Sequence, residues 1–487
     1  ACLVGSEMCI RDRICMEKYD LMSGKAQSFI NPAEINRTLA YAKKYGNDAS
    51  MVRFILDKAR EKKGLTHTEA AVLLLNEDPK VAAEIGTLAE EVKEAYYGNR
   101  IVLFAPLYLS NYCVNGCTYC PYHSQNKHIF RKKMTQEEIK AEVIALQDMG
   151  HKRLALEAGE HPVLNPLEYI LESIDTIYGI KHKAGAIRRV NVNIAATTVE
   201  NYRRLHDAKI GTYILFQETY NREDYEKLHP RGPKANYAWH TEAMDRAMQA
   251  GIEDVGLGVL FGLHNYASEF VGLLMHAEHL EAVYGAGPHT ISVPRLCPAD
   301  DINTGDFANA LPDDIFLKII ALLRLSVPYT GMIISTREGE RIRREALRLG
   351  ISQISGGSKT SVGGYAAPAE PEPDSAQFET ADRRSLDEVV RWLMQLGYVP
   401  SFCTSCYGNG RVGEDFMALC KKQLIHNFCT PNALLTLKEY LDNYASPETR
   451  RIGISLLAEE MNRLPEAKRL FLQKRMEFLK EGKVVFF

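Results

Sequence analysis

The feature that most constrains the fold of this 487-residue chain is a regular alternation of strand-like and helix-like segments along its middle. From about residue 101, short apolar and β-branched runs recur, and each is followed by a stretch of helical periodicity. Such alternation favours a parallel sheet covered by helices, and eight repeats favour an α/β fold of the (β/α)8 TIM-barrel type. Because short apolar runs are ambiguous, the count could differ by one. The expected strands are 102–109, 153–160, 189–195, 212–218, 255–263, 290–296, 332–337 and 351–356, and the expected helices are 135–149, 166–178, 199–207, 239–250, 268–284, 313–325 and 340–349.

The sequences on either side of this region predict additional helical parts. Residues 52–60, 68–75 and 80–97 have helical periodicity, and Asn31 followed by proline predicts where the first helix begins. We expect this extension to pack as a cap on the barrel. After the barrel, a segment rich in Gly, Pro, Ala and Glu predicts a loop or linker. The expected division is a non-native remnant at 1–15, a helical extension at 16–100, the barrel at 101–357, the loop or linker at 358–384, and a mostly helical C-terminal domain with a second metal site at 385–487.

The first residues do not read as part of the folded protein. Residues 3–12 resemble a translated sequencing-adaptor remnant, and they lack the apolar core of a signal peptide. We therefore expect the native start at Met16 or at an upstream residue that is lost here. Cys2, Cys9 and Cys15 are excluded from the candidate metal ligands for the same reason.

Composition and charge exclude several classes of protein. The chain has 59 Lys and Arg against 62 Asp and Glu, and this near balance gives no electrostatic footprint for nucleic acid. We find no uninterrupted apolar run of about 18 residues, so we expect no membrane span. The eleven cysteines cluster at metal-ligand spacing and do not suggest a disulfide framework. This pattern indicates a reducing, cytoplasmic compartment and a low-oxygen host.

The first chemical motif is a loop with three cysteines directly after the first expected strand. Cys113, Cys117 and Cys120 have the spacing C-x3-C-x2-C. Three thiolates on one loop can hold three corners of a [4Fe–4S] cluster and leave the fourth iron open to bind and reduce a substrate. A zinc site fits less well, because structural zinc takes four ligands, usually as two pairs. A disulfide pair or buried thiols would also explain these cysteines. Barrel enzymes place their chemistry at the carboxyl ends of the strands, where this loop lies.

A second set of cysteines lies near the end of the chain. Cys403 and Cys406 form a C-x2-C pair, and Cys429 follows after 22 residues. Three thiolates could again hold an iron–sulfur cluster with one iron free. A zinc site with Cys420 as its fourth ligand, or a group of buried thiols, is the alternative. We interpret Cys297 and Cys420 as core or loop thiols.

The C-x3-C-x2-aromatic-C loop resembles the signature of the radical S-adenosylmethionine (SAM) enzymes. Leu156 to Glu160, with the sequence Leu-Glu-Ala-Gly-Glu, resembles the Gly-Gly-Glu motif of that superfamily, with Ala158 in place of the first glycine. The resemblance implies that Glu160 binds the SAM ammonium group, and that Ala158 and Gly159 let the backbone approach SAM. It further implies a backbone contact of Tyr119 with adenine and a ribose contact or a structural role for Asn193. Glu218 would receive the ammonium group of SAM or of the substrate, and Gly356 and Gly357 would pass close to SAM.

Further stretches resemble the HydG family, the tyrosine-cleaving maturases of FeFe hydrogenase. They are residues 216–221, 228–234 and 287–295, together with the C-terminal C-x2-C-x22-C set, and the resemblance extends from about residue 30 to the end. The ThiH family, the tyrosine lyases of thiamine biosynthesis, shares the barrel motifs but lacks the second cysteine set. A ThiH-like lyase that stops at dehydroglycine is therefore the alternative. An iron–sulfur carrier without catalysis is a third hypothesis, although a carrier needs no SAM motif.

The resemblance to the HydG family implies a specific activity. The first cluster would reduce SAM to methionine and a 5′-deoxyadenosyl radical, which takes a hydrogen atom from the amino group of L-tyrosine. Cleavage of the Cα–Cβ bond then gives p-cresol and dehydroglycine. Dehydroglycine would break down to carbon monoxide and cyanide, captured on an additional iron that is attached to the second cluster with free L-cysteine. The implied partners are a reducing protein such as ferredoxin or flavodoxin and the other hydrogenase maturases.

Positions at the strand ends suggest further ligands for this chemistry. His289 begins the sixth strand, at the bottom of the barrel, and His264 follows the fifth strand, at the top. We therefore expect His289 to bind the additional iron through a neutral imidazole, with a hydrogen-bonded core histidine as the alternative. The tyrosine carboxylate requires a bidentate cation. Arg337 ends the seventh strand, Ser355 on the eighth could assist, and Arg295 at the end of the sixth competes. A salt bridge in the barrel rim is the alternative for either arginine.

Overall fold

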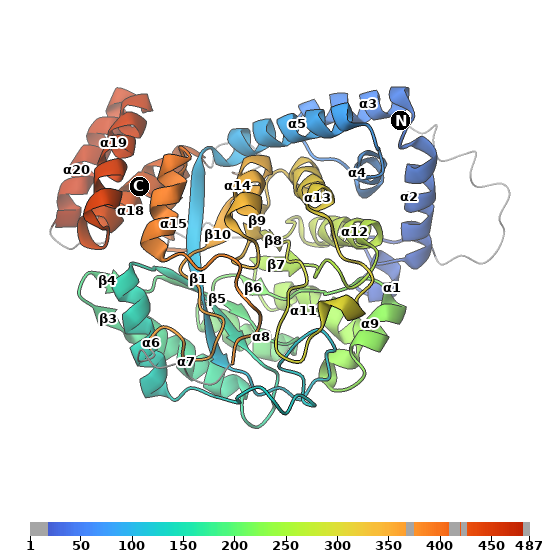
Figure 1. Cartoon of the computed structure of the whole chain (residues 1–487), viewed down its shortest axis with the longest axis horizontal. Helices are drawn as coiled ribbons and strands as arrows, with labels where there is room; N and C mark the ends of the chain where they lie inside the picture. Colours follow the sequence, from blue (N-terminus) through green and yellow to red (C-terminus); the bar gives the residue numbers. More distant parts are fainter. Residues whose placement is uncertain (1–17, 367–374, 409–418, 420–425, 481–487) are drawn as a thin grey trace.

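The computed structural model describes residues 18–366, 375–408, 419 and 426–480. Its centre is a parallel barrel in which β10 pairs back to β1, so that the sheet is closed. The (β/α)8 fold predicted from the alternation is confirmed (Figure 1). The barrel strands, in their order around the barrel, are β1 (Arg100–Ser110), β2 (Arg153–Ala158), β5 (Arg189–Asn193), β6 (Tyr213–Ile214), β7 (Val255–Gly258), β8 (Thr290–Ser292), β9 (Gly331–Ile334) and β10 (Gln353–Ser355).

Helices follow the strands, and local sequence explains where several begin and end. In α6, Thr135 and Glu138 form a reciprocal capping box, and Gly150 ends the helix in the left-handed conformation. The expected helix at 239–250 is divided into two shorter helices, and Glu242 between them accepts a hydrogen bond from the amide of Ala26. The barrel helices are α6 (Gln136–Met149), α7 (Leu167–Gly179), α8 (Val199–Asp207), α9 (Arg222–Leu228), α10 (Tyr237–Thr241), α11 (Ala243–Gln249), α12 (Tyr266–Tyr284), α13 (Asp313–Ser326) and α14 (Glu340–Leu349).

Several strands are shorter than the sequence predicts. The expected strand 212–218 is reduced to Tyr213–Ile214 in β6, although the chain continues beside β7 with a hydrogen bond from Gln217 N to Gly258 O of 2.9 Å. Glu218 has a φ of 68°, which ends the extended run because left-handed backbone does not continue a strand. Two short 3-10 helices, η1 (Pro233–Ala235) and η2 (Thr304–Asp306), lie in the loops at this end of the barrel.

An additional strand was not predicted. β11 (Val399–Ser401) pairs in parallel with the first residues of β1. Val102 of β1 pairs with Gln353 of β10 and with Ser401 of β11, so β10 and β11 lie on opposite edges of β1. β11 thus continues the β2 edge at the amino end of the barrel, and Cys403 follows it directly. A second unpredicted feature is a hairpin of β3 (Lys181–His182) and β4 (Gly185–Ala186).

The N-terminal helices pack against the outer helices of one side of the barrel. α4 and α5 contact α13, α2 and α4 contact α12, and α5 also contacts α14. Figure 1 shows α2 to α5, in blue, beside α12 to α14. Backbone and side-chain hydrogen bonds join the two parts, as from Leu65 N to Leu325 O and from the Tyr97 hydroxyl to Tyr329 O. The extension consists of α1 (Ala26–Phe29), α2 (Pro32–Tyr45), α3 (Ala49–Arg60), α4 (His67–Leu74) and α5 (Pro79–Tyr97).

The C-terminal helices are attached to the other side of the barrel. α18 packs on β11 and α19 packs on α15. Glu439 of α18 accepts bonds from Arg188 at 2.6 Å and lies 3.2 Å from Lys152, and all three side chains are largely buried. These ion pairs fix the C-terminal part to the amino end of the barrel. Its helices are α15 (Leu386–Gln395), α16 (Ser405–Gly408), α18 (His426–Asn443), α19 (Pro447–Arg463) and α20 (Glu466–Lys480).

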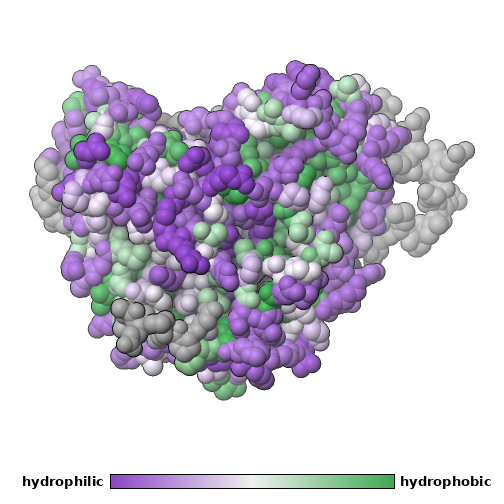
Figure 2. Space-filling model, viewed as in Figure 1, coloured by the Kyte–Doolittle hydropathy of each residue, from purple (hydrophilic) through white to green (hydrophobic). Residues whose placement is uncertain are grey.

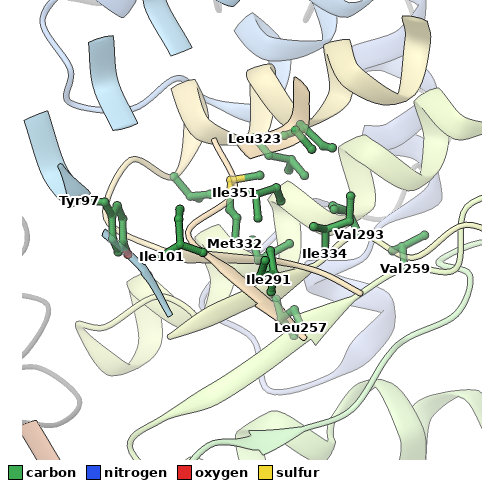
Figure 3. Packing of buried hydrophobic residues seen from close by; sticks show 14 of the residues in the cluster. Tyr97, Ile101, Leu257, Val259, Ile291, Val293, Leu323, Met332, Ile334 and Ile351 are labelled. Atoms are coloured by element: carbon green, nitrogen blue, oxygen red, sulfur yellow. The ribbon is translucent and has the colours of Figure 1, made fainter. Parts of the chain in front are cut away.

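Much of the apolar core lies between the strands and the helices. Leu257, Ile291 and Met332, on three neighbouring strands, are buried and pack outward with Leu323 of α13 (Figure 3). The visible outer face is mostly hydrophilic with separate apolar areas (Figure 2). In the part of the chain that the structure describes, no helix combines the length and apolarity needed to cross a membrane.

Residues 375–384, from the segment predicted as a loop or linker, cross the carboxyl ends of the strands. Their backbone amides bond to the barrel loops, as from Glu379 N to Pro298 O at 3.1 Å and from Ala381 N to Thr336 O at 2.9 Å. Asp382 forms a buried ion pair with Arg343 of α14, and Arg343 also donates to the carbonyl of Ser355 at 2.6 Å. Residues 375–384 therefore pack on the barrel as a loop.

We predict that Arg343→Met lowers the free energy of unfolding by about 1–3 kcal/mol, because it removes one of the two cations that pair with the buried Asp382 carboxylate, the other being Arg384, and leaves the Ser355 carbonyl without its donor. Arg344→Met on the exposed face of the same helix is the matched control, since its ion pair with Glu340 is solvated and contributes roughly 0.5 kcal/mol or less. The measurement is the urea midpoint of both variants. Equal midpoints would contradict the role assigned to this ion pair.

Candidate active site

A cavity opens at the carboxyl ends of the barrel strands, where the first cysteine loop lies. Its walls come from the loop after β1, from the ends of β2 and β5, from the segment after β6 and from residues 375–384. The structure brings together here the predicted residues Cys113, Cys117, Cys120, Tyr119, Ala158, Gly159, Glu160, Asn193, Glu218 and Arg337. The wall also includes residues that were not predicted, among them Asn115, Glu157, Lys234, Gln377 and Phe378.

The cysteine loop is held in place by backbone contacts. A Cβ on Gly159 would lie 2.4 Å from the carbonyl oxygen of Tyr112, so only glycine lets the end of β2 approach this loop so closely. The amide of Val114 donates to the carbonyl of Glu160 at 2.8 Å. The guanidinium of Arg131, which sequence reasoning missed, donates to the carbonyls of Asn111, Tyr122, His123 and Asn126.

The three thiols suit a cluster better than a single ion. Burial raises the pKa of the Cys120 thiol to about 12 and that of Cys117 further, although Lys234 opposes both shifts. A buried thiol becomes a thiolate readily when a metal compensates its charge. Among the described residues, no three His, Cys, Asp or Glu side chains surround one ion position. All three thiols line this one cavity, as three ligands of a [4Fe–4S] cluster must.

The carboxylate of Glu160 lies next to this loop. Asn115 donates to it at 2.6 Å, and burial raises its pKa while the Asn115 bond and Lys234 lower it. Tyr119 is buried, and its hydroxyl lies 2.7 Å from Nε2 of His229. Burial lowers the pKa of His229 to about 3, so its ring is neutral at the pH of the cell. This region therefore offers a carboxylate, an amide and an aromatic side chain beside the three thiols.

Glu218 is already paired with a cation. Its Oε1 lies 2.8 Å from Nζ of Lys234, and both side chains are largely buried. Burial alone would lower the pKa of Lys234, but Glu218 and the nearby thiols Cys117 and Cys120 raise it above its usual value. The positive charge of Lys234 therefore persists beside the cysteine loop. In the sequence, Lys234 is the last residue of the 228–234 stretch. That stretch by itself does not indicate that Glu218 is its partner.

Deeper in the barrel, the cavity continues past Arg337. The Arg337 guanidinium stacks on the ring of Phe378, 3.7 Å from its centroid. Ser355 lines the same part, and its buried hydroxyl has no hydrogen-bond partner among the described residues. Gly356 and Gly357 pack against α15, since an added Cβ on either would lie near Leu386, and their approach to SAM stays a prediction.

Arg295 lies outside this cavity. Its guanidinium bonds to Glu338 at 2.8 Å and to Asp313 at 2.8 Å, so the rim salt bridge describes its position. The strand-end position alone did not reveal these partners, which come from the loop after β9 and from the first residue of α13. The thiol of Cys297 lies between the carbonyls of Arg295 and Arg337, at 3.5 and 3.9 Å, and it faces the upper cavity.

Glu157 is an ionisable residue of the cavity to which the sequence reasoning assigned no role. It lines both the part of the cavity near the cysteine loop and the deeper part. Burial raises the pKa of its carboxyl to about 8, while Arg337 and a hydrogen bond with Asn193 lower it. Glu160, three residues further along the chain, was recognised from its motif. Only the fold shows that Glu157 faces the cavity as well.

A second cavity lies at the amino end of the barrel, below the first. His289 and the three C-terminal cysteines line it with Arg100 and Arg153. Cys403 follows β11, Cys406 lies in α16 and Cys429 lies in α18. His289 Nδ1 lies 3.2 Å from Oδ1 of Asp254, whereas His264 pairs with Asp224 at the top of the barrel. Cys420 lies outside the described residues.

The two cavities are lined by successive inward-facing residues of the same strands. On β1, Val102 faces the lower cavity and Phe104 the upper, and on β10 Gln353 and Ser355 do the same. Residues two apart on a strand are separated by roughly 7 Å. A single layer of side chains therefore lies between the two cavities along the barrel axis.

Comparison with known proteins shows which families this chain resembles. The Radical SAM superfamily pattern matches residues 107–276, and that of the Biotin and Thiamin Synthesis associated domain matches residues 292–399. The 2-iminoacetate synthase of Salmonella typhimurium is 32% identical over 321 residues, which are 65% of this chain and 81% of that enzyme.

Two crystal structures are similar over nearly the whole chain. A structure of HydG, a maturase of the [FeFe]-hydrogenase, is 51% identical with a TM-score of 0.91, covering 94% of this chain and 100% of that one. HydG from Carboxydothermus hydrogenoformans is 39% identical with a TM-score of 0.81, covering 93% and 99%. The chain is a radical SAM enzyme of the lyase class that uses SAM and a [4Fe–4S] cluster. It belongs to the HydG family within the radical SAM superfamily.

Proposed function

We propose that this enzyme cleaves the Cα–Cβ bond of L-tyrosine to p-cresol and dehydroglycine, and converts dehydroglycine to carbon monoxide and cyanide that are collected on iron. The product would be an iron–carbonyl–cyanide synthon for the active site of FeFe hydrogenase. The observation that carries the proposal is the second cavity, in which His289 and three cysteines gather below the first cavity in the same barrel. The 51% identity to HydG, a maturase of the [FeFe]-hydrogenase, supports the same assignment.

At the upper cavity, Cys113, Cys117 and Cys120 would hold the cluster. When bound, the cluster and SAM supply a low-potential electron and a 5′-deoxyadenosyl radical. Glu160, oriented by Asn115 at 2.6 Å, would bind the SAM ammonium group. Tyr119, Ala158, Gly159 and Asn193 would contact the rest of SAM, and the charge of Glu218 is balanced by Lys234.

Tyrosine would lie in the deeper part of the upper cavity. Arg337 would bind its carboxylate in a bidentate manner, and the hydroxyl of Ser355, which lacks a partner among the described residues, would donate to it. Phe378 and Gln377 lie over this site on the segment that crosses the barrel. They would exclude water, which protects a radical from side reactions.

At the lower cavity, Cys403, Cys406 and Cys429 would hold a second [4Fe–4S]-type cluster. His289 would bind an additional iron, which is cargo that also takes free L-cysteine, carbon monoxide and cyanide. The guanidinium groups of Arg100 and Arg153 make this cavity cationic, which favours the cyanide anion. The electron donor would be a reducing protein such as ferredoxin or flavodoxin, and other hydrogenase maturases would receive the synthon.

A second candidate function ends at dehydroglycine. The identity of 32% over 81% of the Salmonella 2-iminoacetate synthase favours it, because 2-iminoacetate is dehydroglycine. An anaerobic assay of reconstituted protein with SAM, dithionite and L-tyrosine separates the two. We expect p-cresol by chromatography together with carbon monoxide trapped by deoxyhaemoglobin. p-Cresol without carbon monoxide, at full iron content, would instead establish the second function.

We predict that Cys117→Ala abolishes p-cresol formation and removes about four iron atoms from the reconstituted protein, because the first cluster loses one of three thiolates. Cys297→Ala is the matched control, since this thiol faces the same cavity without belonging to the loop. Iron content and p-cresol yield are measured for both. Retention of p-cresol formation in Cys117→Ala would disprove the assignment of the first cluster.

We predict that Cys406→Ala keeps p-cresol formation and loses iron-bound carbon monoxide and cyanide, because only the lower cavity loses a ligand. Infrared absorption of the bound carbonyl and cyanide is the measurement, and the p-cresol yield of the same sample is the internal control. An unchanged carbonyl signal would remove the lower cavity from the proposed function.

We predict that Arg337→Gln weakens tyrosine binding roughly 10- to 150-fold, because a hydrogen bond to a charged group contributes about 1.5–3 kcal/mol. Arg341→Gln, an exposed position on α14, is the control. The KM for tyrosine and the dissociation constant of SAM are compared. If the KM of Arg337→Gln equals that of the control, another residue binds the carboxylate.

A further inference from the structure

Three polar side chains form a row across the upper end of the barrel. Tyr108 of β1 pairs in register with Glu157 of β2, and Glu157 pairs with Asn193 of β5. Neighbouring strands lie about 4.8 Å apart, so these side chains are adjacent. Asn193 hydrogen-bonds the Glu157 carboxyl, while the Tyr108 hydroxyl donates to Gln377 at 2.9 Å. Glu157 is therefore fixed in the middle of the row and faces the cavity.

Glu157 and Arg337 both lie where the two parts of the cavity meet. Both line the part near the cysteine loop and the deeper part that contains Ser355. The charge of Arg337 lowers the pKa of Glu157, which places the two groups within electrostatic range of each other. The cavity thus presents one positive and one negative group at the junction of its two parts. The proposed function uses the positive group and gives no role to the negative one.

An α-amino acid carries its carboxylate and its ammonium group on one carbon atom. A site that selects it needs a cation and an anion close together, because each charge must be compensated when water is removed. Two further carboxylates of the cavity have other roles, since Glu218 pairs with Lys234 at 2.8 Å and Glu160 is proposed to bind SAM. The Glu157 carboxyl has no such role, and the neutral amide of Asn193 that bonds to it adds no positive charge.

We propose that Glu157 receives the α-ammonium group of the amino-acid substrate while Arg337 receives its carboxylate. Glu157 is then a positioning residue that restricts the site to α-amino acids and orients the amino group towards SAM. The inference rests on the proposed tyrosine substrate and on the proposed role of Arg337. Asn193 acts through Glu157, because its side chain holds the carboxyl between β1 and β5.

Substrate binding through Glu157 depends on pH. Burial raises the pKa of Glu157 to about 8, opposed by Arg337 and Asn193. The nearby phenols Tyr108 and Tyr122 stay neutral, because burial raises their pKa values as well. A carboxyl is ionised above its pKa, so the binding-competent form increases as the pH rises. The ionised fraction of Glu157, and with it the affinity for tyrosine, should therefore increase between pH 6 and pH 8.

Calorimetric titration of the reconstituted enzyme with SAM and without reductant tests this proposal, because no turnover occurs. The ligands are L-tyrosine and 3-(4-hydroxyphenyl)propanoate, which lacks only the amino group. We expect the wild type to prefer tyrosine at least tenfold at pH 8, and Glu157→Gln to bind both ligands equally at every pH. Glu168→Gln, on the exposed face of α7, is the control and should keep the preference and its pH dependence.

The outcomes separate this inference from the proposed function. If Glu157→Gln keeps the wild-type preference, or loses both ligands alike, the positioning role of Glu157 is wrong even when the wild type makes p-cresol. If the wild type binds tyrosine with no change between pH 6 and pH 8, the inference is also wrong. A wild type that binds neither ligand and makes no p-cresol would overturn both. Glu157→Asp should recover part of the preference for tyrosine, because it restores the charge with a shorter side chain.

Discussion

The pairing of β1 is the interaction on which the rest of the molecule depends. This strand has eleven residues, whereas its barrel neighbours have two to six. Its upper part pairs with β2 and its lower part with β10 and β11. Buried backbone groups must be hydrogen-bonded, so the extra length at the amino end requires a partner, and β11 provides it. The carboxyl end of β1 leads to the first cysteine loop, and β11 leads to Cys403. One strand therefore determines where both cavities lie.

The parts of this arrangement that could be predicted are those that depend on local sequence. Alternation of strand and helix patterns predicted the barrel, and the spacing of Cys113, Cys117 and Cys120 predicted one loop at its top. β11 could not be predicted, because three residues with a central proline have no strand pattern of their own. They form a strand only because the edge of β1 is available beside them. The sequence predicted that the second cysteine set belongs with His289 at the barrel bottom, but not that a ninth strand leads to Cys403 there.

Side-chain partners were predicted less well than element types. Arg295 and Arg337 both end barrel strands, but only the folded loops show that Glu338 and Asp313 pair with Arg295. Glu218 and Lys234 are sixteen residues apart, and no sequence spacing pairs them. Glu157 lies in the same motif as Glu160, and the sequence assigned a role only to Glu160. Its inward position follows from strand register, which pairing across β1, β2 and β5 sets and local sequence does not.

The stacking of the two cavities follows from the two-residue period of a strand. Val102 and Phe104, or Gln353 and Ser355, point into the same barrel but into different cavities. Barrel side chains therefore separate the two cavities, among them the apolar Val102 and Phe104, while other apolar residues of the barrel strands, such as Met332, pack outward against the helices. The two cavities lie one above the other because residues two apart on a strand face the same interior at different heights, so the strands of one barrel bring them together.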